Sequence, residues 1–96
     1  MSQVIGYAVV DTAGALLHSS GVQQVDHIGE GTFHITFDTN VADACQIASI
    51  GDAGAQGWVS AYGGVVGPKV IEVVTGTYEN GHAARKNRTF QLLLVK

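Results

Sequence analysis

The stretch Thr32-Phe33-His34-Ile35-Thr36-Phe37-Asp38 decides the fold class, because apolar and polar residues alternate through it without a break. In an extended strand, successive side chains point to opposite faces, so the two phenylalanines and the isoleucine share one face. Gly29-Glu30-Gly31 precedes the stretch and has the composition of a turn. The pattern predicts a strand with one buried face and one polar face.

Strand-like segments lie on both sides of this stretch and are separated by turns rich in glycine, of which the chain has 13. Short strands at intervals of about 8 to 12 residues are typical of a β-sandwich or a jelly roll. We therefore expect one all-β domain over residues 1–96, an antiparallel β-sandwich or jelly roll of about seven to eight short strands. The expected strands are 4–10, 15–19, 22–28 with a bulge, 32–38, 45–50, 58–62, 69–75 and 89–95.

Four segments carry more specific expectations. Strand 89–95 is apolar on both faces, which predicts a central and buried position in its sheet. Cys45 stands among apolar residues, which predicts a small buried core thiol. Residues 51–57 are rich in glycine, and residues 76–88 form the longest polar stretch of the chain. Both of these segments are expected to be exposed loops.

The composition indicates self-association. Only 14% of the residues are charged while 46% are hydrophobic, so little charge is present to cover the surface of a monomer. The single cysteine cannot form an internal disulfide that would stabilise so small a domain. We therefore expect a homo-oligomer, and a homotrimer in particular.

Several partners and compartments are disfavoured by the same composition. The net charge of −3 argues against a nucleic-acid partner, because binding to phosphates needs a basic surface. No apolar run approaches the length of about 20 residues needed to span a membrane. The first residues lack the features of a cleaved signal peptide, which predicts cytosolic synthesis and leaves open a later release or an association with a virion or a fibre. The final location stays unknown.

No catalytic motif is found around Cys45 or the four histidines, and we expect no enzymatic activity and no cofactor. His34 is a weak candidate for a metal ligand, with His27 as the alternative, because one histidine from each chain of a trimer could meet on the three-fold axis. Histidines gathered on such an axis would repel one another once protonated, and would weaken the assembly at acid pH.

Aromatic and hydrogen-bonding side chains of the second half of the chain are the candidates for ligand binding. Aromatic rings can stack on the apolar face of a sugar, and guanidinium, amide and imidazole groups can bind anionic groups. Packing for the rings, and plain solvation for the polar groups, are the alternatives. The candidate residues are Trp58, Tyr62, Tyr78, Asn80, His82, Arg85, Asn87 and Arg88.

The chain resembles short β-domains associated with bacteria and phages through Gly29-x-Gly31-x-Phe33-x-Ile35-x-Phe37-Asp38, Cys45, Gly51-Asp52 and Arg88-x-Phe90-x-Leu92. It is also similar in architecture to the trimeric heads of the C1q and tumour-necrosis-factor type at fibre tips, and to H-type lectins. This resemblance implies three sandwiches around a three-fold axis, with ligands on loops or between subunits.

Together these observations predict a non-enzymatic recognition or adhesion head. Such a head would bind a glycan or another cell-surface ligand through loops that the trimer repeats three times. The alternative is a purely structural cap or scaffold subunit whose partner is itself or a neighbouring shell or fibre chain.

Overall fold

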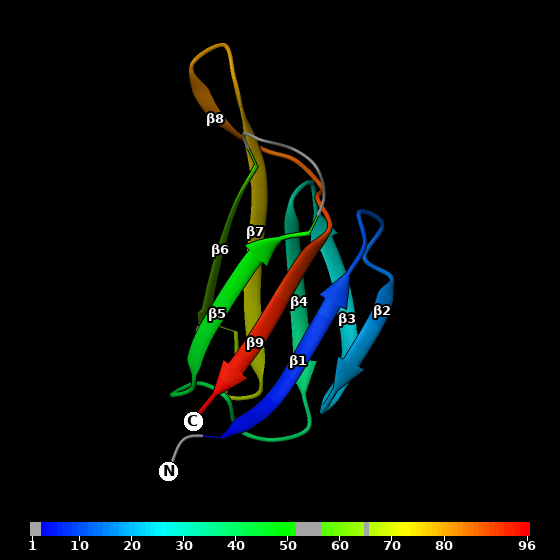
Figure 1. Cartoon of the computed structure of the whole chain (residues 1–96), viewed down its shortest axis with the longest axis vertical. Coiled ribbons are helices and arrows are strands. Elements are labelled where there is room, and N and C mark those ends of the chain that lie inside the picture. Colours follow the sequence, from blue (N-terminus) through cyan, green and yellow to red (C-terminus); the bar gives the residue numbers. More distant parts are fainter. Residues whose placement is uncertain (1–2, 52–56, 65) are drawn as a thin grey trace.

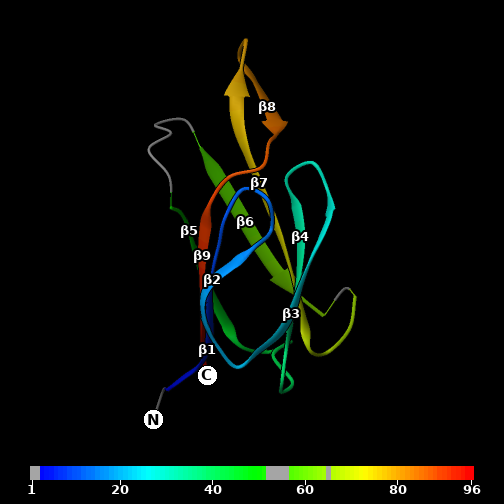
Figure 2. The ribbon, with the colours of Figure 1, turned by 90° about the vertical axis from the view of Figure 1, so that its right-hand side faces the viewer.

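The computed structural model of the protein describes residues 3–51, 57–64 and 66–96. Over these residues the chain forms nine strands and no helix, and the strands make two antiparallel sheets that lie as two layers (Figure 1 and Figure 2). The first sheet has the order β2-β1-β9-β5, and the second has the order β3-β4-β7-β6, with β8 paired to β7. The strands are β1 (Val4–Val10), β2 (Leu16–Ser20), β3 (Val22–Gly29), β4 (Thr32–Phe37), β5 (Cys45–Ile50), β6 (Trp58–Gly63), β7 (Val70–Glu79), β8 (His82–Arg85) and β9 (Phe90–Val95).

The alternating stretch forms β4, and its apolar face is buried as predicted. Phe33 and Ile35 are fully buried, and Phe37 is nearly so. They pack against inward-facing residues of the first sheet in one core, where each buried large apolar side chain contributes about 1.5–3 kcal/mol. The buried members from the first sheet are Ala8, Val10, Phe90, Leu92 and Leu94, and those of the second sheet also include Ile71 and Val73.

The all-β class and all eight expected strands are confirmed, with small shifts at their ends. Strand β9 is central, as predicted, because it pairs with β1 on one side and with β5 on the other. The prediction that it is buried holds for one face only, because Gln91 on the outer face is exposed and Leu93 is half-buried. Strand β3 carries register shifts that mark the expected bulge. The expected loop at 51–57 falls mainly on residues outside the described ones.

The prediction of a long exposed loop over residues 76–88 is wrong. Strand β7 continues to Glu79, turns at Asn80 and Gly81, and returns as β8. Both turn residues have positive φ, 51° and 79°, which is the geometry of a two-residue hairpin with the sequence Asn-Gly. The polar stretch is therefore a β-hairpin that projects at the end of the molecule opposite the two chain ends (Figure 1).

The prediction of a buried Cys45 is also wrong, because its side chain is exposed. Strand β5 is an edge strand, and alternation along it places Gln46, Ala48 and Ile50 toward the core, half-buried. Cys45 therefore lies on the outer face together with Ile47 and Ser49. Ile47, its apolar neighbour two residues on, shares this exposed face instead of covering the thiol in the core.

A salt bridge at the end of the molecule that holds the chain termini gives a pH prediction. Lys96 Nζ lies 2.9 Å from Asp43 Oδ1, and this hydrogen bond, together with the lysine charge, lowers the pKa of Asp43. A carboxyl group with a lowered folded-state pKa stabilises the fold above its unfolded pKa, and this contribution is lost as the pH falls through the folded pKa. Because the pair is solvent-exposed, its effect on stability is small.

We expect Lys96→Met to raise the pKa of Asp43 toward its ordinary value, while Lys69→Met leaves it unchanged. An NMR titration of the Asp43 carboxyl in both variants checks this. Identical Asp43 titration curves in the wild type and Lys96→Met would show that the lysine does not set the pKa.

Candidate functional site

The outer face of the second sheet gathers candidate residues that are far apart in the sequence. Trp58 on β6 is paired with Gly76 on β7, and Gly76 is paired with Arg85 on β8. Opposite residues of antiparallel strands share a face, as do residues two apart along one strand, so Tyr78 belongs to the same face. We call these four residues, Trp58, Gly76, Tyr78 and Arg85, the hairpin face. It spans the part of the sheet where β7 has β6 on one side and β8 on the other.

Trp58 is half-buried and packs within its own chain. Its indole Nε1 donates a hydrogen bond to the carbonyl oxygen of Thr77 at 3.1 Å. Its six-membered ring lies over Gly76, where a Cβ atom would overlap the ring. The absence of a side chain at Gly76 therefore allows the indole to lie flat against β7, at the base of the hairpin.

Arg85 lies over the end of β4. Its Nη1 donates a hydrogen bond to the hydroxyl oxygen of the buried Thr32 at 2.9 Å, which links β8 to β4. A guanidinium group carries five N–H donors, so this bond leaves donors for a second partner. Arg85 is an exposed residue, and its charge is the only one on the hairpin face.

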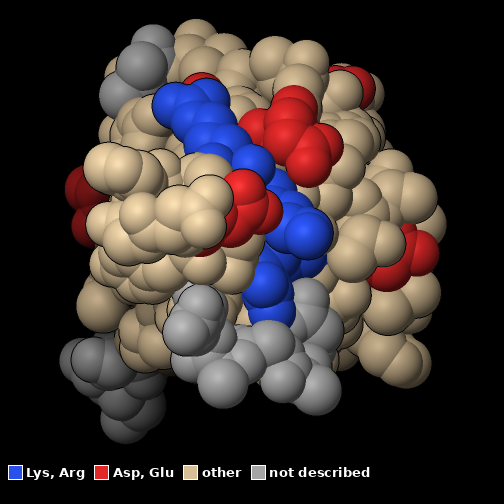
Figure 3. All heavy atoms as spheres, turned by 90° about the horizontal axis from the view of Figure 1, so that it is seen from above, with Lys and Arg blue, Asp and Glu red and all other residues tan. Residues whose placement is uncertain are grey.

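Three of the five basic residues of the chain, Arg85, Lys86 and Arg88, fall within four positions at the end of β8. Figure 3 shows Lys and Arg side chains as one band across the end of the molecule that carries the hairpin, with acidic side chains beside it. Arg88 differs from the others because it is only 9% exposed, with its guanidinium against Gly57. The surface part of the band is therefore Arg85 and Lys86.

Tyr78 is the most exposed aromatic side chain among the described residues, at 55%. Its partner across the hairpin is Ala83, whose small side chain does not cover the ring. Glu79 and His82 are paired one position further on, so they lie on the opposite face of the hairpin. Asn80 occupies the turn. The structure thus places His82 on the face opposite to Tyr78 and Arg85.

Asn87 has a structural position between the two hairpins of the second sheet. Its Oδ1 accepts hydrogen bonds from the backbone N–H of Gly31 at 2.7 Å and from His27 Nε2 at 2.8 Å. The hydroxyl of Thr75 donates to the carbonyl oxygen of Lys86 at 2.7 Å in the same region. These bonds fix the chain that leaves β8 against the turn between β3 and β4.

His34 and Tyr62 lie further along the same outer face. His34 Nε2 is 3.0 Å from Glu72 Oε1, and both side chains are about one fifth exposed. Tyr62 is paired with Glu72 from the other side. Within the described part of the chain, no three His, Cys, Asp or Glu residues are grouped as a metal site would require. His34 therefore has a carboxylate partner within its own chain.

Sequence reasoning missed three features of this region. Gly76 leaves the space that the ring of Trp58 occupies, and Thr32 accepts a hydrogen bond from Arg85. The two residues of each pair are distant in the sequence and become neighbours only in the folded sheet. The hairpin itself has a sequence signal, the pair Asn80-Gly81, which is the strongest short-range indication of a two-residue turn.

Comparison with known proteins adds no relative: no family model, no curated protein and no solved structure matches the chain. Over the described residues, no helix has the length and apolar character needed to cross a membrane.

Proposed function

We propose that this protein is a non-enzymatic recognition or adhesion head that binds a glycan or another cell-surface ligand. In this proposal the domain is a jelly-roll type of sandwich and assembles as a homotrimer. The observation that carries the proposal is the hairpin face, where Trp58, Tyr78 and Arg85 lie on one surface although each was selected separately from the sequence.

The chemistry of the hairpin face suits a saccharide. The exposed ring of Tyr78 and the half-buried indole of Trp58 offer aromatic surface for the apolar side of a sugar ring. Arg85 offers planar donors for a carboxylate, sulfate or phosphate group on that sugar. Such a shallow site binds weakly by itself, and three copies raise the overall affinity by about 10²–10⁴ when the ligand is multivalent.

The place of the hairpin supports the same function. It projects at the end of the molecule opposite both chain ends (Figure 1). Near the chain ends, two backbone hydrogen bonds of 2.9 and 3.0 Å join Gln3 to Lys96. A ligand on the hairpin face is therefore remote from the chain ends.

Tyr78→Ala tests this function. Loss of one stacking ring is expected to weaken binding about tenfold, because an aromatic contact contributes about 0.5–1.5 kcal/mol beyond its buried area. The measurement is a glycan array probed with the wild-type protein, followed by calorimetry of both proteins with the strongest saccharide found. His82→Ala is the matched control, since it removes a ring from the opposite face of the same hairpin.

Three results would contradict the proposal. These are an array without any signal, an affinity unchanged by Tyr78→Ala, and an equal loss of affinity in His82→Ala. The fold of each variant is checked by its urea midpoint, which is expected to match the wild type because Tyr78 and His82 are both exposed.

A structural cap or scaffold subunit is the second candidate, and the position of Trp58 favours it. The indole is hydrogen-bonded to Thr77 and packed on Gly76, so part of its surface serves the fold. A wild-type protein that assembles stably and gives no signal on the array would support this second function.

A further inference from the structure

The first sheet contains no charged residue. None of the residues in β1, β2, β5 and β9 is Asp, Glu, Lys or Arg, so all the charges of the chain lie outside these four strands. The strands of the second sheet, by contrast, include Asp26, Glu72, Glu79 and Arg85. Charged residues are depleted at the centre of protein interfaces, because burying a charge costs free energy unless it is paired.

The outer face of the first sheet is also largely apolar. Tyr7 is paired with Leu93, and Leu93 is paired with Ile47, so these three side chains form a row across β1, β9 and β5. The next row is Val9, Gln91 and Ser49. We call these six residues the uncharged face. Ile47 is 53% exposed and Tyr7 is 39% exposed. Each Å² of apolar surface that a partner removes from water would contribute about 25 cal/mol to the free energy of association.

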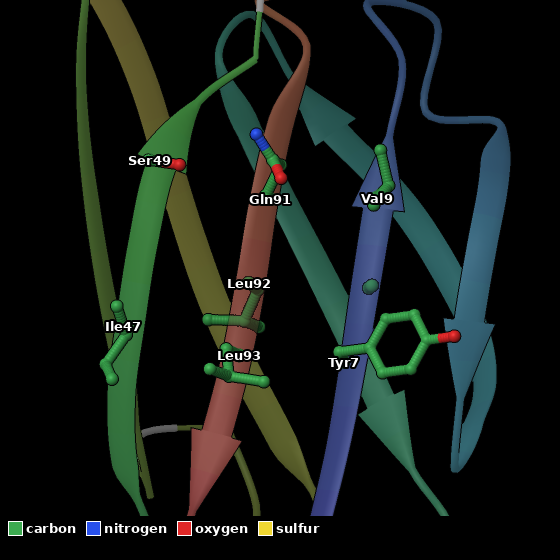
Figure 4. Close-up of a pocket in the computed structure, with 8 residues that line it drawn as sticks. Tyr7, Val9, Ile47, Ser49, Gln91, Leu92 and Leu93 are labelled. Atoms are coloured by element: carbon green, nitrogen blue, oxygen red, sulfur yellow. The ribbon is translucent and has the colours of Figure 1, made fainter. Parts of the chain in front are cut away.

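The uncharged face is shaped as a groove. A depression of about 330 Å³ runs along β9, with Leu93 and Gln91 between Tyr7 on one side and Ile47 on the other (Figure 4). An exposed side chain such as Ile47 on a second copy has the size and polarity to enter this depression. The surface therefore offers both a projecting apolar group and a recess to receive one.

We infer that the uncharged face is the contact between copies of this chain in its assembly. This inference rests on the self-association that is part of the proposed function, and it identifies the surface involved. Two copies with a net charge of −3 repel each other, and the contact that brings no charges together is the one made through the first sheet. In a cyclic trimer, three such faces would line the axis.

Other occupants fit the face less well. A membrane surface would require basic residues around an apolar face, and the strands of this sheet have none. The row of Val9, Gln91 and Ser49 includes an amide and a hydroxyl, which can form hydrogen bonds with a protein partner at the edge of the contact. His34 lies on the second sheet, so an axis lined by the uncharged face would leave it on the outside of the assembly.

The test combines a charge substitution with the single thiol of the chain. Ile47→Glu places a carboxylate in the middle of an edge strand, where it is solvated in a monomer and buried in the proposed contact. Ser60→Glu is the matched control, because it adds the same carboxylate at an exposed position on β6, an edge strand of the second sheet. Light scattering behind size exclusion gives the mass of each protein, relative to the chain mass of 10.0 kDa.

Cys45 reports on the same surface without any substitution. It lies two residues from Ile47 on the same outer face and is exposed in the single chain, so a partner copy would cover it. The rate of its reaction with 5,5′-dithiobis(2-nitrobenzoate) is measured in all three proteins. We expect it to be about tenfold slower in the wild type and in Ser60→Glu than in Ile47→Glu, because a thiolate must be accessible to react.

The expected result is a mass three times that of the chain for the wild type and Ser60→Glu, and the mass of one chain for Ile47→Glu. An assembled Ile47→Glu whose Cys45 reacts at the wild-type rate would overturn the assignment of this surface and would leave self-association standing. A wild type with the mass of a single chain would overturn both. The inference would also be overturned if Cys45 of the wild type reacted slowly because a different protein, purified together with this one, covered it.

Discussion

Gly31→Ala is expected to lower the free energy of unfolding by about 3 kcal/mol or more, because two separate costs add. Gly31 has φ of +68°, a left-handed conformation that costs an L-residue about 1–2 kcal/mol. A Cβ atom at this position would also overlap the carbonyl oxygen of Thr75 and lie 2.8 Å from the backbone nitrogen of Lys86. Both groups are backbone and cannot move away by rotation of a side chain.

The expected loss is large because Gly31 connects the parts that hold the hairpin in place. Its carbonyl oxygen accepts a hydrogen bond from Thr75 at 2.8 Å, and its N–H donates to Asn87 Oδ1 at 2.7 Å. Displacement of β8 would weaken these bonds, each of which contributes about 0.5–1.5 kcal/mol. The hairpin face should lose its order before the core of the sandwich does.

Gly29→Ala is the matched control, two residues earlier at the end of β3. A Cβ atom at Gly29 would meet no atom within 4 Å, and its φ is not positive. We expect a change in unfolding free energy within about 0.5 kcal/mol. Urea unfolding at one protein concentration compares the two variants, since the proposed self-association would make stability depend on concentration. Equal midpoints would show that the overlap at Gly31 is relieved without cost.

The second large effect is expected for Gly76→Ala. A Cβ atom here would overlap the indole of Trp58 and the carbonyl oxygen of Ala84, so either β6 or β8 must move. Overpacking of this kind costs about 1–3 kcal/mol. Trp58 is the only tryptophan, so its fluorescence reports directly on the displacement.

We expect the emission maximum of Gly76→Ala to shift to longer wavelength as the indole leaves Gly76 and meets water, with a lower urea midpoint. Under the proposed function, the affinity for a saccharide should fall as well, because Trp58 no longer holds its position on the hairpin face. Gly67→Ala is the control, since nothing lies within 4 Å of its Cβ position. Unchanged emission in Gly76→Ala would mean that Trp58 does not lie over Gly76.

Much of the fold follows from local sequence. The strand from Thr32 to Phe37 is specified by alternation, and the three apolar residues that alternation places on one face are buried in the core. Alternation also separates Phe90, Leu92 and Leu94 from the outer residues of β9. The prediction of a loop at 76–88 is wrong because Asn80-Gly81 forms a two-residue turn, which lets the polar segments on its two sides pair as strands.

The candidate site was predictable only as a set of residue types. Trp58, Tyr78 and Arg85 could be selected as aromatic or donor groups, yet nothing local indicates that they share a face and that His82 does not. In the sequence, Arg88 and Asn87 belong to the same polar stretch as Arg85 and look equally suited to bind a ligand. In the structure, Arg88 is buried against Gly57, and Asn87 accepts a hydrogen bond from the backbone N–H of Gly31, so both serve the fold.

The sequence by itself therefore determined the all-β class, the positions of most strands and, for the strand from Thr32 to Phe37, the side that faces the core, because a period of two residues is a local property of the chain. The tertiary structure decided which strands pair, which of them form an edge, and hence that Cys45 is exposed and that Trp58 and Arg85 lie on either side of Gly76. It also placed four uncharged strands in one sheet. These outcomes depend on contacts between residues distant in the chain, and such contacts form only when the two sheets pack together.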